Sequence, residues 1–279
     1  MENKSKLIDL DGIIKTRNPQ LYKKLPRFMI RQLERLIRQD EINRLLTLYG
    51  HLDGVEFIDA VFEDMKVGVH CHGLDNVGIE GKKVFVSNHP LGGLDGLAVI
   101  SMANKHFGKA RGIVNDLLLN IDCLKSVFCG VNLYGHNTPE VVNNIDALYA
   151  DEENVCVFPA GLVSRRVDGV VQDLQWKKAF IEKAYAKNLP IVPVYVDALN
   201  TNFFYSVAHW RKKIGVKFNY ELVLLPSEVF KYSGKDIDLY FGKPIMPEEL
   251  SVLKSPQERT LRVRELTYSL KTQTKTTSI

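Results

Sequence analysis

The stretch VFVSNHPLGGLDGL, residues 84–97, decides the fold of this chain. Its first three residues predict a short buried strand, because β-branched and aromatic side chains fit a pleated sheet. The strand must end at His89, since Pro90 lacks an N–H group and biases the residue before it toward extended geometry. Asp95 is a good helix N-cap, and the apolar residues after it predict a helix through residue 103. The stretch therefore places a histidine at the end of a strand and an aspartate at the start of the next helix.

His89 and Asp95 together predict a catalytic pair. A carboxylate beside an imidazole keeps one ring nitrogen protonated, which leaves the other nitrogen to remove a proton from an attacking hydroxyl or amine. Ligands of open α/β sheets bind at the carboxyl ends of the strands, where this pair is expected. Ser87 lies within the strand rather than on an exposed elbow, so the stretch favours direct transfer to a bound acceptor over a covalent intermediate. The alternative is a capping aspartate beside a histidine that only ends a strand.

Outward from this stretch, short apolar runs alternate with segments of helical periodicity. Such alternation favours an α/β fold with a largely parallel or mixed sheet and helices on both faces. Alternating apolar residues in 216–224 predict a further strand near the sheet edge. The expected strands are 67–72, 84–86, 110–114, 127–134, 155–158, 191–196, 216–224 and 237–241, and the expected helices from residue 95 onward are 95–103, 116–124, 139–149, 174–187 and 256–270.

The chain divides into three parts on these patterns. Residues 1–66 are expected to be a helical region packed on the main α/β domain of residues 67–271. Helical periodicity over 26–46 and again over 54–66 predicts a helical hairpin in this first part. The polar residues 272–279 predict a disordered tail.

The helix expected at 26–46 has a basic face that includes Arg31, Arg35 and Arg38. A basic amphipathic helix can lie on an anionic membrane surface. It can equally dock on its own domain and leave the basic face in solvent. The sequence leaves both interpretations open.

Composition excludes several classes of protein. The net charge of +4 over 279 residues is too mild to indicate nucleic acid, and no apolar run approaches the ~18 residues of a membrane-spanning helix. The first residues do not lead into a signal-peptide core, so we expect a cytoplasmic protein with reduced cysteines. His70, Cys71 and His72 are a poor metal site, because strand alternation puts the cysteine on the face opposite both histidines. We therefore expect no metal.

Three loop sequences, in order, resemble the glycerophospholipid acyltransferase family, whose best-known members are 1-acylglycerol-3-phosphate acyltransferases. Residues 88–95 resemble its first block, 158–165 its Phe-Pro-Glu-Gly-Thr-Arg-Ser block and 190–194 its apolar-proline block. The resemblance implies that acyl carrier protein or acyl-CoA supplies an acyl group to the hydroxyl of a lysolipid, with no cofactor and no covalent enzyme intermediate. It also implies His89 as the general base and Asp95 as its orienting partner.

The sequence departs from the family pattern in ways that bear on the site. Five residues, rather than the usual four, separate the His from the Asp, and the flexible Gly92-Gly93 turn is expected to bulge and keep the pair in contact. Ala160 and Val163 stand where the family has Glu and Arg, and the block 128–134 contains no basic residue. A phosphate monoester favours bidentate arginine contacts, and these usual suppliers are absent.

The remaining cations suggest a different acceptor. Arg165 and Arg166, with Lys177 nearby, could hold a singly charged carboxylate by one forked arginine contact, and the alternative for this basic cluster is a solvated loop. A monoacylated amino-acid lipid has such a carboxylate, and the resemblance to bacterial relatives associated with aminolipids permits this acceptor. The residues expected to bind substrate are Asn88, Gly92, Gly93, Gly161, Ser164, Arg165, Arg166 and Lys177, with main-chain N–H groups of the glycines as candidate oxyanion donors.

The sequence thus predicts a peripheral O-acyltransferase on the inner face of the cell membrane, which adds a second acyl chain to a monoacylated lipid. Two alternatives remain open. One is an ordinary 1-acylglycerol-3-phosphate acyltransferase of phospholipid synthesis. The other is a non-catalytic lipid-binding protein that uses the cleft only for docking.

Overall fold

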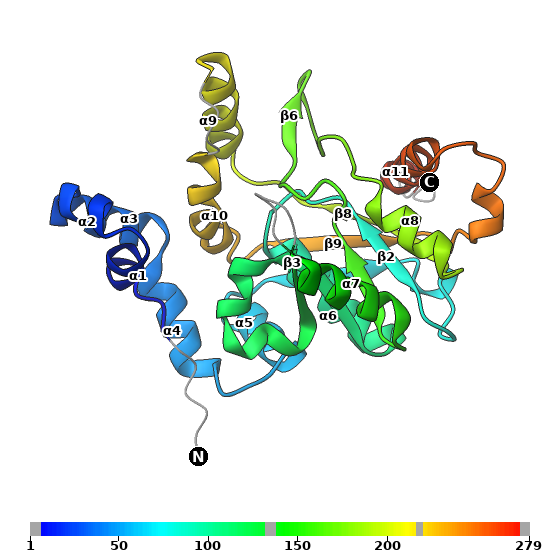
Figure 1. Cartoon of the computed structure of the whole chain (residues 1–279), viewed down its shortest axis with the longest axis horizontal. Coiled ribbons are helices and arrows are strands. Elements are labelled where there is room, and N and C mark those ends of the chain that lie inside the picture. The colour runs from blue at the N-terminus through cyan, green and yellow to red at the C-terminus, as the bar shows by residue number, and fades with distance from the viewer. Residues whose placement is uncertain (1–6, 132–137, 216–219, 274–279) are drawn as a thin grey trace.

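The computed structural model describes residues 7–131, 138–215 and 220–273 and centres on a seven-stranded sheet (Figure 1). All neighbouring strands run parallel except β8 and β9, which are antiparallel. The expectation of a largely parallel sheet is confirmed. In spatial order the strands are β1 (Gly68–His72), β9 (Asp236–Phe241), β8 (Ile191–Asp197), β2 (Val84–Ser87), β5 (Asn154–Val157), β3 (Ala110–Asn115) and β4 (Phe128–Val131).

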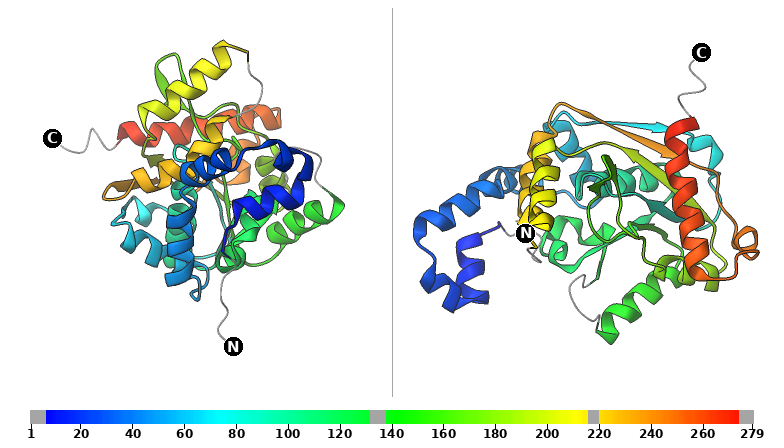
Figure 2. Two further views of the ribbon diagram at one scale, coloured as in Figure 1. Left: turned by 90° about the vertical axis from the view of Figure 1, so that its left-hand side faces the viewer. Right: turned by 90° about the horizontal axis from the view of Figure 1, so that it is seen from above.

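Helices cover both faces of the sheet, as the sequence predicts (Figures 1 and 2). The central strand β2 shows why, because Phe85 packs in one apolar cluster while Val84 and Val86 pack in another. All three side chains have no exposed surface. The first cluster includes α5 (Val55–Asp64) and α6 (Leu94–Phe107), and the second includes α7 (Pro139–Ala150), α8 (Ala179–Ala186) and α11 (Pro256–Gln273).

The N-terminal helices form an arm that projects from the body of the protein (Figures 1 and 2). The single helix expected at 26–46 is wrong, because the chain breaks at Arg38, which adopts a left-handed φ of 57°. Its guanidinium also forms an ion pair with Glu41, 2.5 Å away. The arm consists of α1 (Leu10–Arg17), α2 (Pro19–Lys24), α3 (Arg27–Leu36) and α4 (Gln39–Tyr49).

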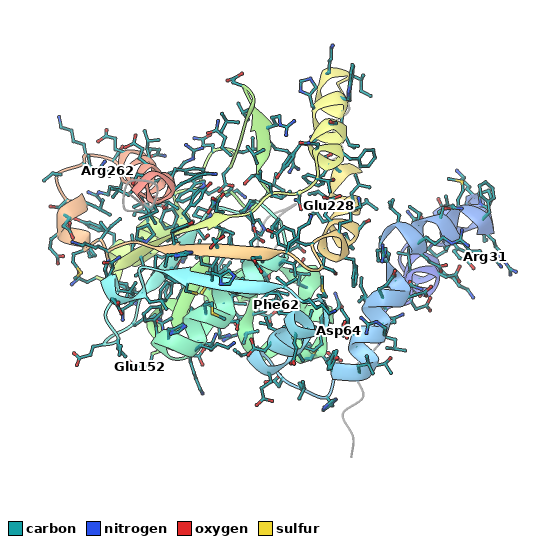
Figure 3. The ribbon with its side chains drawn as sticks, turned by 180° about the vertical axis from the view of Figure 1, so that it is seen from behind. Arg31, Phe62, Asp64, Glu152, Glu228 and Arg262 are labelled. Carbon is teal, nitrogen blue, oxygen red and sulfur yellow. The ribbon has the colours of Figure 1, made fainter. Side chains whose placement is uncertain are left out.

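The arm joins the body where α4 packs against α5, which is the predicted helical hairpin in a shorter form. Arg44 of α4 donates two hydrogen bonds to the Asp64 carboxylate of α5, at 2.9 and 2.5 Å. Asp64 is labelled in Figure 3. Tyr49 donates a third to the same carboxylate at 3.1 Å. The forked contact joins α4 to α5 at the base of the arm.

The segment between β8 and β9 differs most from expectation. Residues 216–219 lie outside the described residues, and Tyr220–Leu224 forms the 3₁₀ helix η4, so the strand predicted at 216–224 is wrong. Leu222 and Leu224 pack against Phe204 and Tyr205 in a third apolar cluster, and this explains their alternation without a strand. The same segment contains two helices, α9 (Asn202–Lys213) and α10 (Leu225–Lys231).

The segment after β5 also differs. Residues 165–172 form an antiparallel hairpin, and the helix expected from residue 174 begins only at Ala179. The turn of the hairpin is Asp168-Gly169, where both residues have positive φ, 49° and 82°. Asp-Gly is a strong signal for this two-residue turn. The hairpin strands are β6 (Arg165–Val167) and β7 (Val170–Gln172).

Smaller differences complete the comparison with the sequence. The helix expected at 116–124 is two 3₁₀ helices, η2 (Asp116–Asn120) and η3 (Asp122–Val127). The predicted strand 127–134 is described only as β4, and residues 274–279 of the predicted tail lie outside the described residues. No helix in the described ranges is long and apolar enough to cross a membrane. Two further 3₁₀ helices are η1 (Leu74–Asn76) and η5 (Pro247–Leu250).

Candidate active site

The predicted catalytic pair lies at the carboxyl edge of the central strands. Strand β2 has parallel neighbours on both sides, β8 and β5, and the chain leaves all three strands at the same edge. His89 follows β2, and the Phe158–Gly161 loop follows β5. Such an edge is where open α/β sheets bind ligands.

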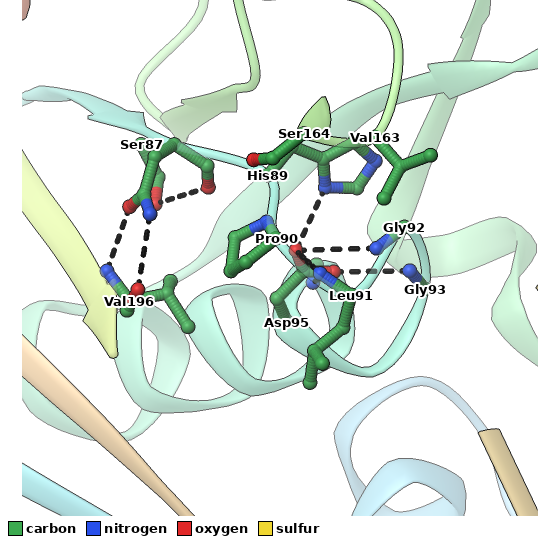
Figure 4. A network of polar contacts seen from close by, with 12 residues as sticks. Ser87, His89, Pro90, Leu91, Gly92, Gly93, Asp95, Val163, Ser164 and Val196 are labelled. Carbon is green, nitrogen blue, oxygen red and sulfur yellow. Dashed lines mark hydrogen bonds and ion pairs between the residues drawn. The ribbon is translucent and has the colours of Figure 1, made fainter. Parts of the chain in front are cut away.

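His89 and Asp95 are in direct contact (Figure 4). Nδ1 of His89 lies 3.0 Å from Oδ2 of Asp95. The Asp95 side chain is fully buried, whereas the His89 side chain is 19% exposed. The carboxylate also accepts hydrogen bonds from the N–H groups of Leu91 at 2.9 Å, Gly93 at 3.0 Å and Gly96 at 2.9 Å. Asp95 is therefore an ionised group held by main-chain donors, with one oxygen aimed at the imidazole.

Each member of the pair stabilises the charged form of the other. Burial raises the pKa of Asp95, but His89 and the main-chain donors outweigh it and hold that pKa below its usual value. Burial lowers the pKa of His89, but Asp95 and the more distant Asp173 outweigh it and raise that pKa above its usual value. An ionised Asp95 keeps the proton of the neutral imidazole on Nδ1, which leaves Nε2 as the basic nitrogen.

The extra residue between His89 and Asp95 is accommodated by the glycine turn. Gly92 has a φ of +75°, and the helix α6 begins at Leu94, one residue before the predicted Asp95. A Cβ atom on Gly92 would lie 3.0 Å from the Cβ of Val163 and 3.1 Å from the Leu225 methyl groups. Position 92 thus requires glycine for both its backbone angle and its packing.

The main chain of His89 is held on both sides. Its N–H group donates to Oδ1 of Asp173 at 3.1 Å, and its carbonyl accepts from the N–H group of Ser164 at 2.8 Å. The side-chain amide of Asn200 donates to the carbonyls of Pro90 at 3.1 Å and Leu91 at 3.3 Å. Sequence reasoning missed Asp173 and Asn200. Asn200 had a usable signal, because it follows the end of a predicted buried strand.

Several residues expected to bind substrate have partners within the protein. Asn88 is buried, and its amide exchanges hydrogen bonds with the N–H and C=O groups of Val196, 2.7 and 3.0 Å away, which ties β2 to β8 (Figure 4). The N–H groups of Gly92 and Gly93 donate to Asp95, and that of Gly161 donates to the Phe158 carbonyl at 2.9 Å. These glycine N–H groups already have acceptors within the protein, and their role as oxyanion donors stays a prediction.

Ser87, Ser164 and Lys177 also form hydrogen bonds within the protein. Ser87 is fully buried and donates to the Asn88 carbonyl at 3.0 Å, so it is not presented as a nucleophile. Ser164 is buried and donates to Oδ1 of Asp173 at 2.5 Å. Lys177 is exposed, and its main-chain N–H donates to the Pro159 carbonyl at 3.0 Å. Its role in binding substrate stays a prediction.

The Arg165 side chain, expected to bind substrate, points into the protein. Arg165 is only 8% exposed and donates to Glu221 of η4 at 2.9 Å. Arg211 of α9 lies 2.8 Å from the other oxygen of the same fully buried carboxylate. Through Glu221, Arg165 ties η4 to the loop after β5, and its role in binding a substrate carboxylate stays a prediction.

Arg166 points the other way along the β6–β7 hairpin. It is exposed, donates to the side chain of Asn202 at 2.8 Å and stacks over the Tyr205 ring at 5.4 Å. Of the two arginines, Arg166 is the one with a guanidinium at the surface.

An apolar wall lies beside the catalytic pair. Val163, Phe204 and Tyr205 form the third apolar cluster, and Leu225 packs against it while also approaching Gly92. The Phe158 ring lies 4.7 Å from the His89 ring, centroid to centroid. Val163 stands where the resembled family has an arginine, so an apolar side chain takes the place of a cation next to the base (Figure 4).

The histidines of β1 have protein partners. His72 contacts Asp238 at 2.7 Å and His70 lies 3.6 Å from Asp236 on the neighbouring strand β9. Cys71 packs toward the core, and burial raises its pKa to about 11. In the ranges that the structure covers, no group of His, Cys, Asp and Glu side chains is arranged to hold a metal ion.

An α/β sheet with a His–Asp pair at its central carboxyl edge, the histidine partly exposed, is an arrangement suited to general-base chemistry. Residues 12–277 match the model of the acyltransferase family, and the chain therefore belongs to that family and is an acyltransferase.

Named relatives match nearly the whole chain. The lyso-glycine lipid O-acyltransferases of Bacteroides thetaiotaomicron and Phocaeicola vulgatus are each 37% identical to it over 265 residues. The matches cover 95% of this chain and 97% and 95% of the two relatives. Among solved structures, the 1-acyl-sn-glycerophosphate acyltransferase PlsC of Thermotoga maritima is similar with a TM-score of 0.49 and 18% identity, over 95% of this chain and 93% of that one.

Proposed function

We propose that this acyltransferase transfers a fatty acyl group from a thioester donor to the hydroxyl of a monoacylated glycine lipid. The observation that carries the proposal is the buried Asp95 carboxylate aimed at the partly exposed His89 imidazole. The 37% identity to two lyso-glycine lipid O-acyltransferases, over almost the full length of each, supports this acceptor. The donor is acyl carrier protein or acyl-CoA.

The mechanism follows from the protonation of the pair. Nε2 of His89 takes the proton of the acceptor hydroxyl as its oxygen attacks the thioester carbonyl carbon. A C–O bond forms, and the Asp95 carboxylate stabilises the imidazolium through Nδ1–H. When the intermediate collapses, the C–S bond breaks and the proton passes from Nε2 to the departing thiolate. The products are an ester and a free thiol.

The base must be neutral to act. Because Asp95 and Asp173 raise the pKa of His89, kcat/KM falls as the pH drops below this raised pKa. The acid limb of the pH profile thus reports the electrostatic surroundings of the imidazole.

The charge distribution near the base supports a carboxylate-bearing acceptor over a phosphate. Val163 is apolar and buried, Ala160 has no charge, and Arg165 shares the Glu221 carboxylate with Arg211. Because Val163 replaces the arginine of the family pattern, a phosphate monoester would lack that usual partner beside His89. The surface guanidinium of Arg166 is the candidate partner for one carboxylate. The proposal is tested by supplying lyso-glycine lipid and an acyl thioester and measuring the diacylated lipid and the free thiol.

Two other functions remain as outcomes of that test. Faster transfer to lysophosphatidate than to lyso-glycine lipid would make the protein an ordinary 1-acylglycerol-3-phosphate acyltransferase. Binding of both lipids without any transfer would make it a lipid-docking protein. We favour an enzymatic role over a docking role because docking does not need the contact between His89 and Asp95.

We further propose that the protein is peripheral on an anionic membrane surface at the cytoplasmic face. Arg31 and Arg35 of α3 are exposed, and Arg31 lies on the projecting arm (Figure 3). Arg38 differs, because it pairs with Glu41 and stacks over Phe230 of the body. Next to these cations Phe28 is 65% exposed, which suits a shallow apolar anchor.

The helix α9 offers a second surface of the same kind. Phe203 and Trp210 are 60% and 58% exposed, and Ile214 just beyond the helix is 70% exposed. The Lys213 ammonium lies 4.8 Å from the Trp210 ring. Exposed aromatic side chains beside cations favour the boundary between lipid headgroups and acyl chains.

Charge reversal on the arm is expected to weaken membrane binding. Arg31→Glu/Arg35→Glu should reduce the affinity for anionic phosphatidylglycerol vesicles roughly tenfold or more, because each basic residue near such a surface contributes about 1 kcal/mol. Sedimentation with vesicles at low and high salt measures this. The matched control is Lys243→Glu/Lys254→Glu, which changes the net charge equally at exposed positions outside the arm. Binding that is insensitive to salt and equal in both double variants would contradict the membrane role of the arm.

A further inference from the structure

Asp173 lies between the β6–β7 hairpin and α8, outside every motif that the sequence analysis singled out. Its side chain is only 3% exposed. Oδ1 accepts hydrogen bonds from the N–H group of His89 at 3.1 Å and from the hydroxyl of Ser164 at 2.5 Å. Oδ2 accepts from Nε1 of Trp176 at 2.8 Å. A buried carboxylate with this set of donors joins three separate segments of the chain.

These contacts converge on the backbone of one residue, His89. The N–H group of His89 binds Asp173, and the carbonyl of His89 binds the N–H group of Ser164 at 2.8 Å. Because Asp173 also binds the Ser164 hydroxyl, the two loops that follow β2 and β5 are fixed to each other through a single side chain. Asp95 holds the ring of His89, and Asp173 holds its backbone.

The backbone of Asp173 is itself held by the C-terminal helix α11. Its N–H group donates to the Tyr268 hydroxyl at 2.8 Å, and its carbonyl accepts from Arg264 at 3.1 Å. Arg264 also donates to the side chain of Gln172 at 2.9 Å. The position of the carboxylate is therefore set by an element far from the catalytic pair in sequence.

We propose that Asp173 is a positioning residue for acyl transfer, which fixes the backbone of His89 so that its imidazole keeps its contact with Asp95 and its approach to the acceptor hydroxyl. The proposal rests on the His89 mechanism given above. It reassigns Ser164, expected from the sequence to bind substrate, to the support of the base. A displacement of about 1 Å at a catalytic group can reduce the rate by roughly 100-fold, so this support has a large effect on turnover.

Asp173→Asn tests the proposal with little change in shape. One end of an amide is a donor, so Asn cannot accept hydrogen bonds from both Trp176 and His89 as the carboxylate does. We expect kcat to fall roughly 10- to 100-fold, with KM for acceptor and donor nearly unchanged. Asp95 and Asp173 are the carboxylates that raise the pKa of His89, so the acid limb of the kcat/KM profile should also move to lower pH.

The matched control is Asp64→Asn. Asp64 also accepts three hydrogen bonds, but all come from side chains, two from Arg44 and one from Tyr49, and they lie at the base of the N-terminal arm. It should lower the melting temperature without shifting the acid limb. If Asp173→Asn lowers the melting temperature as Asp64→Asn does, yet keeps the wild-type kcat and acid limb, Asp173 is only structural and the proposal is wrong.

Ser164→Ala keeps the proposal testable if Asp173→Asn does not fold. It removes one donor to Asp173 and leaves the main-chain bond to His89. We expect a smaller loss of kcat with an unchanged acceptor KM. A raised acceptor KM with normal kcat would instead return Ser164 to substrate binding and overturn the proposal. Wild-type protein assayed in parallel distinguishes a failure of the proposed function from a failure of the Asp173 proposal. An inactive wild type would overturn the proposed function. If the wild type is active, an unexpected result from the variants overturns only the role of Asp173.

Discussion

His89→Ala is expected to lower kcat for acyl transfer by roughly 10²- to 10⁴-fold, because the hydroxyl acceptor then loses its general base. The main-chain hydrogen bonds of His89 to Asp173 and Ser164 do not involve its ring, so the variant should keep its fold by circular dichroism. Its affinity for the lysolipid should change little, since the base is needed in the transition state more than in the bound ground state. Initial rates with purified protein measure the effect.

His106→Ala provides the matched control. His106 is exposed near the end of α6, the same helix that begins beside the catalytic pair, and its replacement should leave kcat unchanged. Asp95→Asn should lose most of the activity as well, since an amide in place of the carboxylate misdirects the imidazole tautomer. A wild-type rate from His89→Ala would exclude the mechanism.

Glu221→Ala is expected to have the largest effect on stability. The change leaves Arg165 and Arg211 facing each other around a buried space, without the carboxylate that now lies 2.9 and 2.8 Å from them. Breaking a buried ion pair from one side costs about 3–5 kcal/mol of the free energy of unfolding. For a chain of this length that corresponds to a fall in melting temperature of roughly 6–20 °C, which calorimetry measures.

Glu182→Ala is the control for this variant. Glu182 pairs with Lys178 on the surface of α8 at 2.9 Å, with both side chains nearly half exposed, so its loss should cost less than about 1 kcal/mol. Arg165→Ala should likewise lower the melting temperature and leave the acceptor KM unchanged. A raised acceptor KM in a stable Arg165→Ala variant would restore Arg165 as a substrate-binding residue.

The sequence predicts those parts of the site that are determined by residues close to one another along the chain. His89 and Asp95 are six residues apart, and the proline and glycines between them dictate the turn that joins them. The strands of the sheet were predicted because buried apolar runs identify them without knowledge of their neighbours. The fold class could therefore be derived from local patterns alone.

The features that the sequence did not reveal depend on distant partners. Arg165 pairs with Glu221, 56 residues away, in a segment whose alternation resembled a strand. Asp173 binds the backbone of His89 across 84 residues, and no local pattern marks it. The N-terminal helix breaks at Arg38, where no glycine or proline in the sequence indicates a break. The Asp168-Gly169 turn differs from these cases, because its sequence carries a clear hairpin signal.

The central claim is that the base acts on the hydroxyl of a lysolipid with a carboxylate head. The most direct test offers lyso-glycine lipid and lysophosphatidate with matched acyl chains to the same thioester donor and compares kcat/KM for the two acceptors. We expect a preference of roughly tenfold or more for the glycine lipid, because Val163 puts an apolar side chain rather than an arginine beside the base, and Arg165 is bound to Glu221. The His89→Ala variant should reduce transfer to either acceptor. Equal or faster transfer to lysophosphatidate would contradict the account.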